Sequence, residues 1–526
     1  MTKAVVKPTR RGGKMKKRAW RMFVSRYAIC AYIILAEILL MAGVILAASV
    51  ISYIFFILAL VVDVIAVTVI INRDANPEYK VSWIIVVLLM PLFGTLMYAI
   101  FYRRTMTKKE ERLLDSIFSR INEHRGDNSA IDMLRSDDPR AAGKAQAIMK
   151  DDPVAEVYCK SSSTYFPTGE AYFESLLADL KEAKDYIFLE YFIVSHGSLW
   201  SEIHEILVEK AKAGVEVRIM FDDFGCMRTL PSNYEILLRM EGIKAERFAR
   251  VSPKMSSVHN NRDHRKICII DGKIGYTGGV NLADEYANRI VRFGYWKDAG
   301  IRISGDAVGG LMKHFLSGWD FTVGDISDYT KYFDSVESSA EPDGGYYLPF
   351  GSGPAPIYER PVGKHAFLNL INQATDYLYI NTPYLIIDYE LSESLRNAAL
   401  RGVDVRIITP SKEDKKQVKV MTKSSYPHLM EAGVKIYEYT PGFIHSKNVI
   451  CDDKYAVIGT INFDYRSLAH HFEDAVWIYS SPTVFAVKQD FLNTVEQSER
   501  VDENKSRLTT AEWLTRNAIR LFAPLM

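Results

Sequence analysis

The sequence contains few cysteines, little net charge and none of the short patterns that mark common metal sites. Its 5 cysteines are odd in number and lack a framework spacing, which favours a reducing, cytoplasmic setting over a disulfide-stabilised fold. Neither Cys-x-x-Cys nor His-Glu-x-x-His occurs. The formal net charge is +1, and no basic stripe interleaved with aromatic residues is present, so we expect no nucleic-acid partner.

Long apolar runs, by contrast, are abundant near the N-terminus. Residues 1–26 carry about ten Lys and Arg and no acidic residue, as a cytoplasmic membrane flank does. Residues 27–71 form an apolar tract interrupted only by Glu37 and Asp63, and at about 1.5 Å per residue it would span a hydrocarbon layer roughly twice. We therefore expect two helices with a turn near residues 47–52, too much apolar sequence for a signal peptide.

A further apolar run, residues 81–102, completes a predicted transmembrane segment of two to three helices over residues 27–102. A buried helical hairpin in a soluble core is the alternative interpretation. The run is followed by a second basic flank, "YRRTMTKKEER" at residues 102–112. Three crossings would put the two basic flanks on opposite sides, against the positive-inside preference, whereas two crossings would put both inside. Pro91 and Gly94 interrupt the last run, which favours a re-entrant break, a multi-pass anchor and a catalytic part facing the cytoplasm.

The remainder of the chain has an α/β pattern and is duplicated. Residues 103–155 are polar and partly helical, which indicates a connector, and strand and helix signals alternate after it. "AKDYIFLEYFIVS" resembles "ATDYLYINTPYLI", and "AGVEVRIMF" resembles "RGVDVRIIT", in the same order along the chain. We therefore predict two pseudo-symmetric lobes, residues 156–330 and 340–526, each a mixed sheet flanked by helices.

Each predicted lobe contains one copy of the pattern His-x-Lys-x4-Asp-x6-Gly-[Gly/Thr]-x-Asn, within residues 259–286 and 440–467. The first copy comprises His264, Lys266, Asp271, Gly278 and Asn281, and the second comprises His445, Lys447, Asp452, Gly459 and Asn462. Apolar and β-branched neighbours place each copy on or at the end of a strand, so that His and Lys project from one face. One such cluster is ordinarily a solvated strand face, but two copies inside a wider repeat indicate a functional site.

If the lobes pack about a pseudo-twofold axis, two His, two Lys and two Asn converge on one pocket suited to a phosphodiester. One His can attack phosphorus while the other protonates the departing alkoxide, and Lys and Asn stabilise charge on the non-bridging oxygens. The two motif aspartates, near the following turns, can support the site through hydrogen bonds. We expect Asp298 and Glu473, at matching places, each to accept a hydrogen bond from the imidazole of its own lobe. A zinc site is a competing hypothesis, which the lysine beside each histidine disfavours.

At these residues the sequence resembles the phospholipase D superfamily, whose signature is the duplicated His-x-Lys-x4-Asp motif. Four stretches are more closely similar to the bacterial cardiolipin synthases: "INRDANPEYKVSWIIVVLLMPLFGTLMYAIFYRR", "LEYFIVSHGSLWSEIHEILVEKAKAGVEVR", "GTINFDYRSLAHHFE" and "WLTRNAIRLFAPLM". Two features depart from the family: His471 lies where we expect Asn, and residues 27–47 add an apolar segment to the usual two-helix anchor. The amphipathic residues 512–526 are expected either at the bilayer surface or packed against the second lobe.

The resemblance implies two phospholipase D-like lobes behind a transmembrane segment in the bacterial cell membrane. It implies that the catalytic residues are His264, Lys266, Asp271, His445, Lys447 and Asp452, with no metal or other cofactor. The implied reaction transfers a phosphatidyl group from one phosphatidylglycerol through a phosphohistidine to a second, giving cardiolipin and glycerol. A phospholipase D or another phosphatidyltransferase of the superfamily is the alternative, and a catalytically silent scaffold is disfavoured because all six residues are present.

Overall fold

In a computed structural model the chain forms two compact units, an N-terminal unit that ends at Arg104 and a larger body that begins at Thr105. The structure describes residues 35, 39, 50–73, 75–102, 106–250, 261–339 and 341–520. The basic flank and the helix predicted over residues 27–47 lie outside the described residues, apart from positions 35 and 39.

The described part of the N-terminal unit contains three apolar helices, α3 (Val50–Ile71), α4 (Pro77–Leu89) and α5 (Phe93–Tyr102). Among the described residues, α3 alone is long and apolar enough to cross a membrane, over Tyr53–Ile71 with a mean hydropathy of 3.1. The last apolar run is divided between α4 and α5, so the interruption predicted from Pro91 and Gly94 is confirmed.

The break between α4 and α5 accounts for the acidic residue in α3. Asp63 is buried, and its Oδ1 accepts hydrogen bonds from the backbone N–H of Leu92 (3.3 Å) and the hydroxyl of Thr95 (2.8 Å). Gly94 lies so close to α4 that a Cβ there would be 2.4 Å from the carbonyl oxygen of Val86. The carboxylate therefore satisfies polar groups that become available where the helix breaks.

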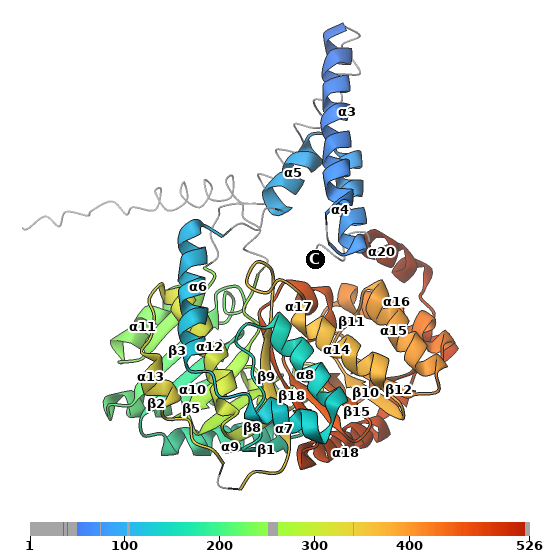
Figure 1. Ribbon diagram of the computed structural model, residues 1–526. Coiled ribbons are helices and arrows are strands. Elements are labelled where there is room, and N and C mark those ends of the chain that lie inside the picture. The colour runs from blue at the N-terminus through green and yellow to red at the C-terminus, as the bar shows by residue number, and fades with distance from the viewer. Residues whose placement is uncertain are drawn as a thin grey trace, which may run out of the picture. The chain divides into compact units, whose positions relative to one another are not determined.

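The body contains two mixed sheets, green to yellow and orange to red in Figure 1, whose strand orders match except for one additional edge strand in the second. In each sheet one central strand pairs parallel on one side and antiparallel on the other. The first sheet has seven strands, in the order β1 (Ser161–Phe166), β8 (Gly300–Gly305), β6 (Ile274–Gly278), β5 (Lys266–Ile270), β2 (Tyr186–Tyr191), β3 (Glu216–Asp222) and β4 (Lys244–Phe248). The second has eight, in the order β9 (Tyr346–Ser352), β18 (Glu473–Tyr479), β16 (Tyr455–Gly459), β15 (Asn448–Cys451), β10 (Tyr377–Asn381), β12 (Asp404–Pro410), β13 (Lys435–Tyr439) and β19 (Ser498–Arg500). The two-lobe α/β fold is confirmed.

Helices cover both faces of each sheet, and one apolar core is shared by the two lobes. The inner helices α12 (Val308–Val323) and α18 (Pro482–Glu496) contribute to this core together with strands of both sheets, and each contacts the edge strand of the other lobe. The outer faces carry α9 (Gly169–Glu182), α10 (Ser198–Lys212), α14 (Val362–Gln373), α15 (Tyr389–Leu400) and α16 (Lys416–Glu431). Strand side chains alternate between the shared core and an outer core, as Phe188 and Ile187 do.

The polar segment predicted as a connector packs into the body instead. It forms α6 (Lys108–Glu123), α7 (Ser129–Asp137) and α8 (Pro139–Asp151). Leu114, Ile117 and Ile121 make an apolar stripe at helical spacing on α6, and the last two lie in the shared core. Near the other end of the chain, α20 (Thr510–Arg520) contacts α16 of the second lobe, with Lys423 and Glu512 3.8 Å apart. Residues 521–526 lie outside the described residues.

Candidate active site

The two predicted histidines lie just before strands β5 and β15, where the backbones of the two lobes meet. The backbone N–H of His264 donates to the carbonyl of Phe472 in the second lobe (2.8 Å). The N–H of His445 donates to the carbonyl of Lys297 in the first lobe (2.7 Å), next to a short parallel pairing of β14 (Gly442–Ile444) with β7 (Tyr295–Lys297). Each histidine is therefore fixed against the segment of the opposite lobe that carries the supporting acid.

This arrangement corrects the pairing expected from sequence. Nδ1 of His264 lies 2.8 Å from Oε2 of Glu473, and Nδ1 of His445 lies 2.7 Å from Oδ2 of Asp298. Each acid does contact the imidazole of a motif histidine, but it is the histidine of the opposite lobe. The backbone contacts between the lobes bring each acid to that histidine. With Nδ1–H donated to a carboxylate, Nε2 of each ring is the nitrogen left for chemistry.

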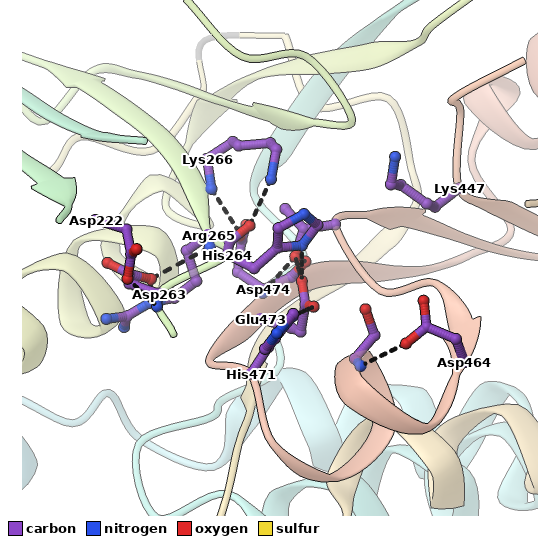
Figure 2. Close-up of polar contacts among 12 residues, drawn as sticks. Asp222, Asp263, His264, Arg265, Lys266, Lys447, Asp464, His471, Glu473 and Asp474 are labelled. Atoms are coloured by element: carbon purple, nitrogen blue, oxygen red, sulfur yellow. Dashed lines mark hydrogen bonds and ion pairs between the residues drawn. The ribbon is translucent and has the colours of Figure 1, made fainter. Parts of the chain in front are cut away.

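The two lysines are held beside the histidines by hydrogen bonds to backbone. Nζ of Lys266 donates to the carbonyl of His264 (2.6 Å), and Nζ of Lys447 donates to the carbonyl of His445. Nζ of Lys447 also lies 2.8 Å from Nδ1 of His445. Nδ1 cannot both donate to Asp298 and accept from the lysine, and we assign it a proton that it donates to the Asp298 carboxylate. Each histidine, with its lysine and the acid from the opposite lobe, forms one half-site. Figure 2 shows Lys266 on one side of the His264 imidazole and Lys447 on the other.

Burial dominates the electrostatics of these four groups. It lowers the pKa of His264 to about 3 and that of His445 to about 4, so both rings are neutral at pH 7. Burial also lowers the pKa of Lys266 to about 8 and of Lys447 to about 7. An anionic phosphodiester bound among them would favour the charged forms again, since opposite charges raise the pKa of a base.

Aromatic rings enclose both histidines, each of which is only 7% exposed. The ring of Phe192 packs edge-on against His264, with centroids 5.0 Å apart. Tyr286 packs in the same way against His445 at 5.4 Å, and Trp296 lies 5.3 Å from that imidazole. The surroundings of the reactive nitrogens are therefore largely shielded from bulk water.

The two motif aspartates lie at the opposite ends of the strands from the histidines. Asp271 is five residues beyond Lys266, about 16 Å along an extended strand. Its carboxylate accepts backbone N–H groups of Lys184, Asp185 and Tyr186, each at 2.8 Å. Asp452 accepts the matching N–H groups of the second lobe, at residues 375–377. These carboxylates hold the start of β2 and β10 and do not face the histidines.

The two asparagines differ from each other. The amide of Asn281 is committed, because Oδ1 accepts from the N–H of Ile193 (3.0 Å) and Nδ2 donates to the hydroxyl of Tyr286 (2.8 Å). It therefore positions the ring that covers His445, through one of the two N–H groups of its amide. Oδ1 of Asn462 is buried and has no hydrogen-bond partner among the described residues.

Two residues of the site were not predicted. Asp474 joins the lobes, because it accepts the backbone N–H of Lys266 (3.1 Å) and the hydroxyl of Thr277 (2.5 Å). His471, noted in the sequence only as a departure, lies beside Glu473 on the side away from His264 (Figure 2). The repeat gave no signal for Asp474, because the strand pairing makes it equivalent to Ala299 of the first lobe.

Comparison with known proteins identifies the class. A family described as "Cardiolipin synthase, PLD-like domain" matches residues 176–290 and 367–495, and a phospholipase D-nuclease N-terminal family matches residues 61–103. The crystal structure of a phosphatidylserine synthase from Haemophilus influenzae covers 73% of this chain and 97% of that chain, with a TM-score of 0.55 and 14% identity, which shows the fold alone. The two half-sites therefore belong to a phospholipase D-like enzyme.

Relatives identify the family more closely. The chain is 34% identical over 471 residues to cardiolipin synthase 2 of Bacillus anthracis, covering 87% of this chain and 89% of that protein. It is 32% identical to a cardiolipin synthase of Halalkalibacterium halodurans (87% and 91% covered) and 39% identical to an uncharacterized protein of Streptococcus mutans (88% and 99% covered). The chain belongs to the cardiolipin synthase family of phosphatidyltransferases, which are membrane enzymes, in agreement with the apolar helix α3.

Proposed function

We propose that the chain synthesises cardiolipin by transferring the phosphatidyl group of one phosphatidylglycerol to a hydroxyl of another. The observation that carries the proposal is the pair of half-sites, each a neutral imidazole whose Nδ1 is held by a carboxylate of the opposite lobe. A displacement at phosphorus without metal needs a nucleophile and a proton donor on opposite sides of one phosphodiester. Two crossed pairs supply both.

The reaction proceeds in two displacements at one phosphorus. In the first, Nε2 of one neutral histidine forms a bond to phosphorus and the bond to the glycerol oxygen breaks. The other histidine, which takes up a proton on Nε2 when the anionic phosphodiester binds, gives that proton to the departing alkoxide. In the second, that histidine takes the proton of the acceptor hydroxyl, the acceptor oxygen bonds to phosphorus, and the phosphorus–nitrogen bond breaks. Free glycerol and cardiolipin are the products, and both histidines return to their starting state.

The remaining predicted residues have two kinds of role in this proposal. Lys266 and Lys447 stabilise charge on the non-bridging oxygens, with Asn462 as a further polar contact. Asp298 and Glu473 orient the rings, while Asn281 positions Tyr286. Asp271 and Asp452 act through the fold, by fixing β2 and β10 against the strands that follow the motifs.

The shielding of the site favours transfer over hydrolysis. Phe192, Tyr286 and Trp296 enclose the two imidazoles, which limits the access of water to a phosphohistidine. A phospholipase D remains the second candidate, because it would use the same residues with water as the acceptor. No nucleic-acid substrate is proposed, and phosphatidylglycerol and cardiolipin in the bilayer are the proposed partners.

We further propose a multi-pass anchor in the bacterial cell membrane with the body on the cytoplasmic side. At about 1.5 Å per residue, α4 and α5 are roughly 20 and 15 Å long, each too short for a 30 Å hydrocarbon layer. The pair therefore suits a re-entrant segment, which leaves both basic flanks on one side. Cysteine labelling at engineered positions in residues 1–26 and 106–112, in sealed vesicles, should give the same accessibility for both flanks, and opposite accessibility would overturn this topology.

The reaction is tested with purified full-length protein in phosphatidylglycerol vesicles. Wild type should release equal amounts of cardiolipin and glycerol, and His264→Ala and His445→Ala should release neither. His365→Ala is the matched control, because His365 pairs with Asp151 at the surface of the body, outside the site. Phosphatidic acid without cardiolipin would identify a hydrolase, and cardiolipin from either active-site variant would refute the paired-histidine mechanism.

A further inference from the structure

The half-site of His264 contains a third ligand-type side chain that the reaction does not use. His264, His471 and Glu473 are all buried, and one potential ligand atom from each lies within 4.8 Å of the others. Nδ1 of His471 is 3.6 Å from Oε1 of Glu473, longer than a hydrogen bond. Neither ring nitrogen of His471 nor Oε1 of Glu473 has a hydrogen-bond partner among the described residues. Buried polar atoms without partners are unfavourable, so this group lacks something that would bind to it.

The other half-site provides an internal comparison. Gly278 pairs with Gly300 and Gly459 pairs with Ala475, so Asp298 and Glu473 occupy equivalent places two residues before those partners. His471 is then equivalent to Trp296, which has no ligand atom. The second oxygen of Asp298 is also occupied, because it accepts the N–H of Ala299 (2.9 Å). Within the described residues, only the half-site of His264 offers two imidazoles and a free carboxylate oxygen.

The contacts of Glu473 leave one of its oxygens for a cation. Oε2 of Glu473 accepts from Nδ1 of His264 (2.8 Å) and from the hydroxyl of Thr460, whereas Oε1 has no hydrogen-bond partner among the described residues. The opposing charge nearby is Lys266, whose Nζ donates to the carbonyl of His264 (2.6 Å).

We propose that His264, His471 and Glu473 form a binding site for a divalent transition metal of the zinc type, and that its occupancy switches the enzyme off. Two imidazole nitrogens, one carboxylate oxygen and one water make a tetrahedral set that Zn²⁺ accepts. Ligand atoms around tetrahedral zinc are roughly 3.3 Å apart, so the ligand atoms must approach one another by at most about 1.5 Å. The metal is an inhibitor and not a cofactor, because it takes both His264 and its supporting carboxylate away from the phosphorus.

The site is tested on full-length protein in detergent micelles after treatment with a chelator. Titration with Co²⁺ should give the visible absorption of a tetrahedral complex at one equivalent, and Zn²⁺ should displace it. His471→Asn should remove this absorption, whereas the surface control His365→Asn should keep it. In phosphatidylglycerol vesicles, Zn²⁺ should inhibit wild type reversibly, and His471→Asn should need at least tenfold more Zn²⁺ for the same fractional inhibition of its own metal-free rate.

The outcomes separate this site from the proposed reaction. Co²⁺ binding needs no turnover, so it can be positive even if the chain makes no cardiolipin. His471→Trp, which installs the residue of the other half-site, is a second variant in case the asparagine protein does not fold. No tetrahedral absorption, or equal Zn²⁺ inhibition of wild type and a folded His471 variant, would overturn the proposal and leave His471 and Glu473 in a long polar contact only.

Discussion

The crossed pairing of histidines and carboxylates can be measured as a coupling energy. His264 and Glu473 are joined by a 2.8 Å contact between side chains that are 9% and 0% exposed. A hydrogen bond to a charged group contributes about 1.5–3 kcal/mol to stability. A double-mutant cycle of His264→Ala and Glu473→Ala should therefore give a coupling of that size in the free energy of unfolding. The same-lobe cycle of His264→Ala and Asp298→Ala should be additive within about 0.5 kcal/mol.

The assay is urea unfolding of the full-length protein in micelles, followed by tryptophan fluorescence and by circular dichroism. Coincident transitions are required before free energies are compared. The reciprocal cycles, His445 with Asp298 and His445 with Glu473, provide the matched control in the other half-site. A coupling within one lobe that equals or exceeds the crossed one would refute the geometry on which the mechanism rests.

Three further predictions follow from burial and close contact in the body. The kcat/KM for cardiolipin formation should fall as the pH rises through about 7 to 8, because Lys447 and Lys266 lose their protons there, and Lys447→Arg should shift this limb upward if turnover is retained. Gly279→Ala should lower the rate at least about 100-fold, because its Cβ would be 2.0 Å from the carboxylate that supports the second histidine, whereas Gly143→Ala, with open space around its Cβ, should retain activity. Burial raises the pKa of Asp474 from 3.8 to about 6, so the folded state binds this proton more tightly and stability is lost as the pH rises through about 6. At pH 7.5, Asp474→Asn should therefore unfold at a higher urea concentration than wild type, with a free energy of unfolding that is larger by up to about 3 kcal/mol. This difference should vanish near pH 4.

Repetition was the feature of the sequence that made the fold predictable. Blocks of residues recurring in the same order predict two copies of one unit, and the strand orders of the two sheets match except for one additional edge strand in the second. The break between α4 and α5 was also predictable, because Pro91 and Gly94 interrupt an otherwise continuous apolar run. Asp63 stood out in the same way within α3. The helices α6 to α8 were underestimated because their apolar stripes are narrow within a charged segment.

The repeat did not predict that each acid contacts the histidine of the opposite lobe. Internal similarity shows that Asp298 and Glu473 are equivalent, but it does not show which lobe's imidazole each one meets. That choice depends on backbone contacts between distant segments, such as His264 with Phe472, which leave no pattern in either segment. The position of Asp271, in contrast, follows from strand geometry alone, since five extended residues separate it from Lys266.

The distance in sequence between each histidine and its acid has a consequence for synthesis of the chain. His264 is translated 209 residues before Glu473, so its imidazole lacks a supporting carboxylate until the second lobe has been made. A nascent or truncated chain that ends before the second lobe then holds neither a working nucleophile nor a proton donor. The proposed reaction therefore requires a chain that extends at least through Glu473.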